Sequence, residues 1–221
     1  LSGLGYIIFS SLFQLYVFVA IMGVSFTLSS ILGEFYKSFK KQKNSSNFLH
    51  SIVKMFLSNR HKNGGYIVHI GIVLLFIGFI GRAFEVEKEF SLSPGEQIYF
   101  SNYVFKLNSI KSEARDNHYA FLSEIDVVDS STNQLLTNLK PEKRIYFYWN
   151  SDPEKRQPHS ELDIYSTIQK DIYSIFSGYD AQKNIGYFKI MINPLVNWVW
   201  IGGVLMVIGS LFAFWPSRRN S

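Results

Sequence analysis

The chain has 221 residues, 47% of them hydrophobic, with a formal net charge of +5 and a sequence pI of about 9.2. It contains no cysteine, which excludes disulfides, a CxxC redox motif and any cofactor attached to this chain through thioether bonds. Its basic residues cluster beside long uncharged segments, so the high pI indicates membrane topology signals and contacts with anionic lipid, and we expect no nucleic-acid partner.

Three uncharged segments are long enough to cross a bilayer. Residues 1–33, 64–81 and 190–216 carry no formal charge, and at about 1.5 Å per residue each covers the hydrocarbon core as a helix. We therefore predict three transmembrane helices over these ranges. The first segment is too long for a secretory signal peptide and lacks its basic start. Because the first residue is not Met, we expect a processed chain or a piece of a longer one.

Charge is distributed unevenly between these spans. Residues 34–62 hold seven Lys or Arg against one Glu, the tail 217–221 holds two Arg, and residues 82–189 hold thirteen Lys or Arg against sixteen Asp or Glu. The positive-inside rule then predicts that the loop 34–63 and the tail 217–221 are cytoplasmic and that the segment 82–189 lies outside. In the loop, residues 48–57 have the spacing of an amphipathic helix at the membrane interface, and Asn63-Gly64-Gly65 is expected to end it.

The outer segment, 82–189, changes from helical to alternating periodicity. Apolar and polar residues alternate from Phe84 to Leu92, which predicts a strand leaving the membrane. More strands are predicted at 97–110, 119–128, 134–139 and 144–149, with a turn at 129–133, while 161–176 fits a strand or a helix. This spacing favours a small sandwich or barrel. The predicted fold class is an integral membrane α-helical protein with three transmembrane helices and an extracytoplasmic all-β or β-rich domain.

His69 lies about two turns inside the second predicted span, where no residue carries a formal charge. An ionisable ring at such a depth is costly and indicates a functional site by default. On a helical wheel, Gly64, Gly71 and Gly78 form a stripe roughly opposite His69. This stripe predicts close packing of a neighbouring helix on the glycine side, with the histidine presented on the other side.

Apolar side chains share the histidine's side of the helix, so His69 is a candidate axial ligand to the iron of a b-type haem. The alternative is a histidine that only forms a hydrogen bond to a carbonyl or hydroxyl across a helix pair, and position alone does not decide between the two. A single histidine gives one axial bond. None of the three predicted spans holds a second histidine, so the partner ligand would have to come from another helix.

The remaining candidates have simpler interpretations. His50 and His61, in the basic loop, are expected to be solvated, as are His118 in a predicted turn and His159 in a polar loop. Lys143 and Arg144 would form a solvated strand face, with pairing to a haem propionate or an acidic partner as the functional alternative. The sequence shows no Ser-His-Asp triad, phosphate-binding glycine loop or paired metal-ligand motif.

Three motifs follow one another in an order that is characteristic of one family. They are Gly64-Gly65-Tyr66-Ile67-Val68-His69-Ile70-Gly71, Glu142-Lys143-Arg144-Ile145-Tyr146, and Asn193-Pro194-Leu195 leading to Trp200-Ile201-Gly202-Gly203. Together they resemble the C-terminal part of the cytochrome c haem lyase subunit family CcmF. The resemblance implies a protein of the bacterial inner membrane, or of an organellar membrane, with its large loop periplasmic. It also implies a role in cytochrome c maturation, in which haem from a haem chaperone is joined to the CxxCH cysteines of apocytochrome c.

The resemblance further implies that His69 is one of two axial histidines of a haem b that supplies reducing equivalents, with quinol as a possible donor. The implied partners are the haem chaperone, the other maturation subunits, apocytochrome c, membrane lipid and the N-terminal portion of the same subunit. The family's tryptophan-rich outer loop, the histidines beside it and the second haem b ligand have no counterpart here. We therefore expect a split subunit or a fragment that is part of a haem lyase complex and inactive alone. A non-catalytic assembly scaffold, whose β-domain docks maturation partners, is the alternative.

Overall fold

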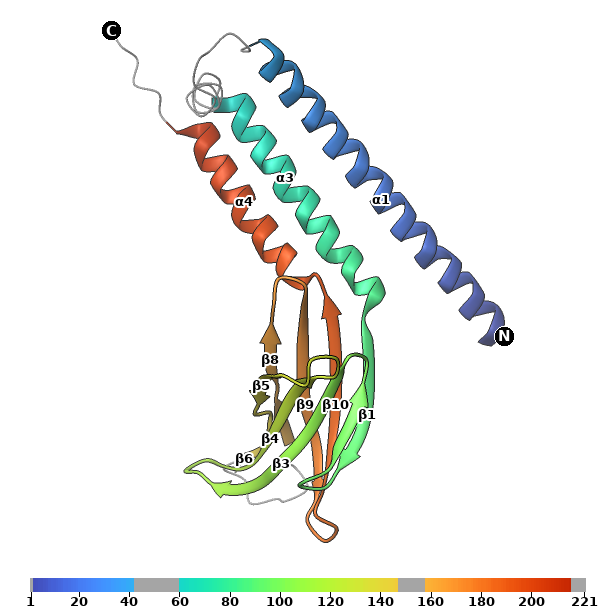
Figure 1. The fold of residues 1–221 in the computed structure, drawn as a ribbon, viewed down its shortest axis with the longest axis vertical. Helices are drawn as coiled ribbons and strands as arrows, with labels where there is room; N and C mark the ends of the chain where they lie inside the picture. Colours follow the sequence, from blue (N-terminus) through green and yellow to red (C-terminus); the bar gives the residue numbers. More distant parts are fainter. Residues whose placement is uncertain (1, 42–59, 147–157, 216–221) are drawn as a thin grey trace. The chain divides into compact units, whose positions relative to one another are not determined.

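The computed structural model describes residues 2–41, 60–146 and 158–215 (Figure 1). Contacts between Cα atoms divide the chain into two units. One comprises residues 1–84 and 194–221, and the other comprises residues 85–193. The predicted amphipathic segment 48–57, with His50, lies outside the described residues.

The first unit is helical. Its described elements are α1 (Ser2–Lys41), α3 (Arg60–Gly81), the short 3-10 helix η1 (Arg82–Phe84) and α4 (Val196–Phe214). Among the described residues, three helical stretches are long and apolar enough to cross a membrane: Leu15–Glu34 in α1, Arg60–Phe84 across α3 and η1, and Val196–Phe214 in α4. The three predicted membrane-length helices are confirmed.

Two boundaries of these helices differ from the sequence prediction. The helix containing His69 does not begin after Asn63-Gly64-Gly65 but runs through it from Arg60. Within this helix, Gly64 lies against Ala213 of α4, where a side chain would clash. The third helix begins at Val196 and not at residue 190. Residues 190–194 instead belong to a strand, whose register pairs Ile190 with Lys88 and Ile192 with Val86.

The second unit contains ten strands in its described part. They are β1 (Val86–Leu92), β2 (Gln97–Phe100), β3 (Tyr103–Ala114), β4 (His118–Asp129), β5 (Leu135–Leu139), β6 (Glu142–Tyr146), β7 (Pro158–Glu161), β8 (Asp163–Ser166), β9 (Lys170–Asp180) and β10 (Ile185–Pro194). One sheet has the order β1-β10-β9-β8 and the other β2-β3-β4-β6-β7, with β5 also paired to β4. The β-rich domain is confirmed, and of the two predicted forms it is a sandwich.

Alternating residues of both sheets form the core of the sandwich, as expected where each strand buries one face. Phe176 of β9 is fully buried and stacks on Phe188 of β10, with ring centroids 4.9 Å apart. Phe105 of β3 is fully buried on the opposite sheet. These aromatic side chains make the two sheets one hydrophobic unit.

Two predicted strand regions are resolved as hairpins. Residues 97–110 form β2 and most of β3, separated by a turn in which Ser101 has φ of 54°. Residues 161–176, which fitted a helix or a strand, contain β8 and part of β9. The turn between them is closed by Thr167, whose hydroxyl donates to the Lys170 carbonyl oxygen at 2.7 Å.

Candidate functional site

Glycines bring α3 and α4 into close backbone contact. A Cβ atom added at Gly71 would lie 2.7 Å from the Gly202 carbonyl oxygen, and one added at Gly209 would lie 2.8 Å from the Val68 nitrogen. Gly64 and Gly78 likewise have no room for a side chain against α4. The predicted packing of a neighbouring helix on the glycine stripe is therefore confirmed, and this neighbour is α4.

His69 lies on the other side of α3, where its side chain is exposed in this structure. Its Nδ1 atom is 2.7 Å from the Gly65 carbonyl oxygen, one turn earlier in the same helix. A carbonyl oxygen only accepts hydrogen bonds, so this geometry assigns the proton to Nδ1 and leaves a lone pair on Nε2. Metal-bound histidines in proteins are commonly held in this way, with the second ring nitrogen donating to a carbonyl or carboxylate.

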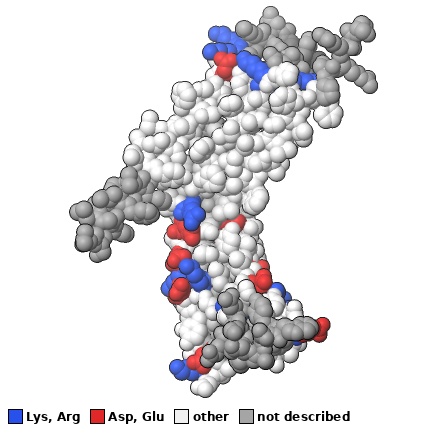
Figure 2. All heavy atoms as spheres, turned by 180° about the vertical axis from the view of Figure 1, so that it is seen from behind, with Lys and Arg blue, Asp and Glu red and all other residues white. Residues whose placement is uncertain are grey.

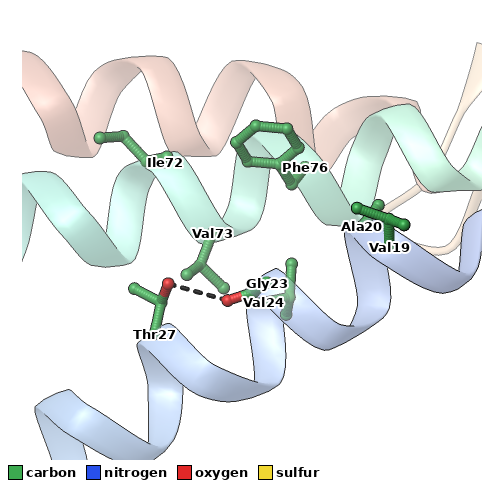
Figure 3. A pocket seen from close by; sticks show the side chains of 8 residues that line it. All are labelled: Val19, Ala20, Gly23, Val24, Thr27, Ile72, Val73 and Phe76. Carbon is green, nitrogen blue, oxygen red and sulfur yellow. Dashed lines mark hydrogen bonds between the residues drawn. The ribbon is translucent and has the colours of Figure 1, made fainter. Parts of the chain in front are cut away.

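An apolar cavity of about 300 Å³ lies between α1 and α3, beginning one turn beyond His69 (Figure 3). Helix α3 contributes Ile72, Val73 and Phe76 to its wall. The α1 residues that line it are Val19, Ala20, Gly23, Val24 and Thr27. Figure 3 shows Val73 pointing toward α1, and the Thr27 hydroxyl turned back to the carbonyl oxygen of Gly23, to which it donates at 2.8 Å. The one hydroxyl in the wall is thus satisfied within its own helix.

A charged cluster links α1 and α3 at the other end of the same helix face. The Lys62 Nζ atom lies 2.9 Å from Glu34 Oε2, and Lys37 Nζ lies 3.2 Å from Glu34 Oε1. The Tyr66 hydroxyl is 3.4 Å from Glu34 Oε2. In Figure 2, charged side chains gather at this end of the helices, while the helix surface beyond it is white. Sequence analysis missed this cluster because its partners are 28 residues apart.

The sandwich brings two other candidate histidines together. His118 begins β4, and its ring centroid lies 4.9 Å from that of Tyr146, while the His159 centroid lies 5.6 Å from the same tyrosine ring. The predicted solvated turn at His118 is wrong, because this side chain is only 7% exposed. Its Nδ1 lies 2.6 Å from the Asn117 Oδ1 oxygen, and its buried Nε2 has no hydrogen-bond partner among the described residues.

The Glu-Lys-Arg-Ile-Tyr motif forms β6 and takes part in an ion-pair network. Glu142 lies 2.9 Å from Arg144 and 3.5 Å from Arg115, and Arg144 also pairs with Glu161 at 3.1 Å. These acidic neighbours raise the pKa of the Arg144 guanidinium, with Glu142 the largest cause. Lys143 instead donates to the Ser160 hydroxyl at 2.9 Å. Both basic side chains therefore have partners within the sandwich.

Histidine, cysteine, aspartate and glutamate do not gather in groups of three that could hold a metal ion anywhere in the described ranges. Within them the structure offers no carboxylate or histidine cage for a metal. Among the described residues, the face of α3 that carries His69 stands out as a candidate cofactor site, because it lies between an apolar cavity and a charged cluster.

Comparison with known proteins relates both units to one family. The family model described as the CcmF C-terminal β-sandwich matches residues 83–194. Among curated proteins, the cytochrome c-type biogenesis protein CcmF of Haemophilus influenzae is 24% identical over 200 residues, covering 90% of this chain and 29% of the relative. The probable cytochrome c-type biogenesis protein NrfE of Escherichia coli is 25% identical over 155 residues, covering 70% of this chain and 26% of the relative.

A solved structure titled Cytochrome c Heme Lyase CcmF superposes with a TM-score of 0.63 at 17% sequence identity, covering 87% of this chain and 29% of that one. At this identity the similarity concerns the fold alone. The chain spans less than a third of the length of each of these three proteins.

Proposed function

This chain belongs to the CcmF family, whose C-terminal β-sandwich it contains, and on that basis we propose that it acts in cytochrome c-type biogenesis as the haem-b-binding portion of a membrane haem lyase. Its curated relatives carry names of cytochrome c-type biogenesis proteins. The motifs around His69, Glu142 and Asn193 support the same assignment. The three membrane-length helices support a place in a bacterial membrane.

The observation that carries the proposal is the hydrogen bond of the His69 ring, which leaves one ring nitrogen available. The Gly65 carbonyl oxygen holds Nδ1 at 2.7 Å, so Nε2 is the nitrogen available to iron, and the helix fixes the orientation of the ring. The neighbouring wall of Ile72, Val73 and Phe76 is the apolar surface against which a macrocycle can be buried. The residues present therefore fit a b-type haem with His69 as one axial ligand.

A bound haem b supplies one-electron chemistry, and the chain's own contribution is to hold it. His69 would supply a nitrogen ligand to the iron, the Gly65 carbonyl oxygen would set its tautomer, and Ile72, Val73 and Phe76 would contact the macrocycle. Helices α1 and α4 contain no histidine, so a second histidine ligand from another helix would have to come from outside the part of the chain that the structure describes. In this proposal, reducing equivalents, with quinol as a possible source, keep incoming haem ferrous while the complex joins it to apocytochrome c.

The charge distribution supports an orientation for this assembly. The basic loop 34–63 and the tail 217–221 would lie in the cytoplasm, and the β-sandwich would lie in the periplasm. There the sandwich would meet the haem chaperone, other maturation subunits and apocytochrome c. Lipid would surround the exposed apolar faces of the helices, such as Trp200, Val204 and Leu211 of α4.

The test compares His69→Ala with His61→Ala in the chain's own organism, each variant carrying an affinity tag. His61 lies on the same helix but is exposed in its first turn, so it controls for loss of an imidazole. We expect His69→Ala to lower the haem b content of the purified chain, and the yield of c-type cytochromes, by roughly tenfold or more. His61→Ala should change neither.

Co-purifying partners separate the proposed function from the scaffold alternative. A haem-binding subunit with His69→Ala keeps its partners while it loses haem b and cytochrome maturation. If that variant keeps both its partners and its maturation activity, the histidine only packs and the scaffold function is correct. An unchanged absorption spectrum in His69→Ala would remove His69 as an iron ligand.

A further inference from the structure

We propose that two features of α3 on either side of His69 fix the orientation of the haem. The hydrocarbon edge of the haem would lie in the α1–α3 cavity, and the haem carboxylates would point toward Lys62. This inference rests on the proposed function, since it assumes that His69 binds iron. It adds two determinants of haem orientation that the bond between His69 and iron does not provide. One is an apolar pocket for one edge of the ring, and the other is a cation for the opposite edge.

The cavity is suited to hydrocarbon. Ile72, Val73 and Phe76 follow His69 by three, four and seven residues, the spacing that places side chains on one face of a helix. The Thr27 hydroxyl donates to the Gly23 carbonyl oxygen, so it offers no unsatisfied hydrogen to a ligand. An apolar wall of this kind favours contact with hydrocarbon groups.

The charged cluster lies in the opposite direction from the histidine. Lys62 precedes His69 by seven residues, or about 10 Å along the helix axis, and falls on the same stripe. Two lysines share one carboxylate here, since Lys62 and Lys37 both contact Glu34. Lys62 also lies over the Tyr66 ring, 5.6 Å from its centroid, so a second carboxylate would share this ammonium group with Glu34 and Tyr66, while Lys37 still pairs with Glu34.

The apolar cavity on one side of His69 and Lys62 on the other match the two edges of a porphyrin. One edge of a b-type haem carries methyl and vinyl groups and the other carries two carboxylates. The opposite orientation would place both carboxylates against an apolar wall without partners, which is strongly unfavourable. A phospholipid has a related chemistry, with an acyl chain for the cavity and a phosphate for Lys62. The experiments below distinguish it from haem.

The first experiment fills the cavity. An added Cβ at Gly23 would meet no atom within 4 Å, and the same holds at Gly33 on the same helix, outside the cavity lining. Both Gly23→Leu and Gly33→Leu improve helix propensity, so neither should impair folding of α1. We expect Gly23→Leu to lower the haem content of the purified chain several-fold and Gly33→Leu to leave it unchanged.

The second experiment removes the cation. Lys62→Met should lower the midpoint potential of the haem, because a nearby positive charge favours the reduced form. It should also weaken haem retention by roughly tenfold, the value of one charge-assisted hydrogen bond. Lys40→Met removes a charge from an exposed position of α1 and should leave both quantities unchanged.

The outcomes separate this orientation from the proposed function. If His69→Ala loses haem while Gly23→Leu and Lys62→Met both keep wild-type haem content and potential, the orientation is wrong and the proposed function stands. An effect of only one of the two variants also contradicts the orientation, which needs both ends. If His69→Ala keeps its haem, the proposed function fails first.

Discussion

Replacing Gly202 by alanine is expected to force α3 and α4 apart. The new methyl group would lie 2.5 Å from the Gly71 carbonyl oxygen and 2.9 Å from the Leu75 nitrogen. Both atoms belong to the backbone of α3, so no side-chain rotation relieves the contact. Overpacking of this kind costs about 1–3 kcal/mol. For a chain of this size that corresponds to a fall in apparent Tm of roughly 3–10 °C.

The next residue along α4 is the matched control. Gly203 has no atom within 4 Å of an added Cβ, so Gly203→Ala should gain the helix propensity of alanine, about 1 kcal/mol, without a clash. The measurement is thermal unfolding of both purified variants in the same detergent, followed by size-exclusion chromatography. Equal Tm values in the two variants would show that the close contact between α3 and α4 does not stabilise the helical unit.

The placement of His69 could be predicted because a helix has a fixed period. Residues seven apart fall on nearly the same stripe, so the spacing of Gly64, Gly71 and Gly78 defined one face and left His69 on the other. The structure adds that Gly202 and Gly209 on α4 repeat this spacing. Which helix would meet the stripe was beyond the sequence, because that contact joins segments far apart in the chain.

The boundary between β10 and α4 was mispredicted for a local reason. Residues 190–216 carry no formal charge, so a buried strand and a membrane helix merge into one apolar segment. The signal that separates them is Asn193-Pro194, because a residue before proline is biased toward extended conformations. The chain then turns at Leu195, whose φ is 62°, and the helix follows.

Contacts between polar side chains that are distant in sequence were the least predictable part of the fold. The link from Glu34 to Lys62 and Tyr66 depends on how α1 packs beside α3, and the burial of His118 depends on pairing with Tyr146 across two strands. Neither follows from periodicity, since each joins residues that are distant in sequence. The charge pattern predicts a cytoplasmic side for the loop 34–63 but does not predict the partners of its residues.

Replacing Phe176 by alanine is expected to have the largest effect on the sandwich. Its side chain is 0% exposed and packs face to face on Phe188, so truncation removes a stacked pair and leaves a cavity between the sheets. Changes of this kind cost about 3–5 kcal/mol, a large share of the 5–15 kcal/mol that holds a typical domain folded. Hydrogen exchange of the whole chain should show amides of β9 and β10 exchanging roughly 10²- to 10³-fold faster.

Tyr99→Ala provides the aromatic control, because Tyr99 on β2 is 65% exposed and its loss creates no internal cavity. Exchange in this variant should match wild type within a few-fold, as for most surface substitutions. Wild-type protection of β9 and β10 in Phe176→Ala would contradict a core shared by the two sheets. Faster exchange in β3 and β4 together with β9 and β10 would show that the sandwich unfolds as one cooperative unit, as a single hydrophobic cluster requires.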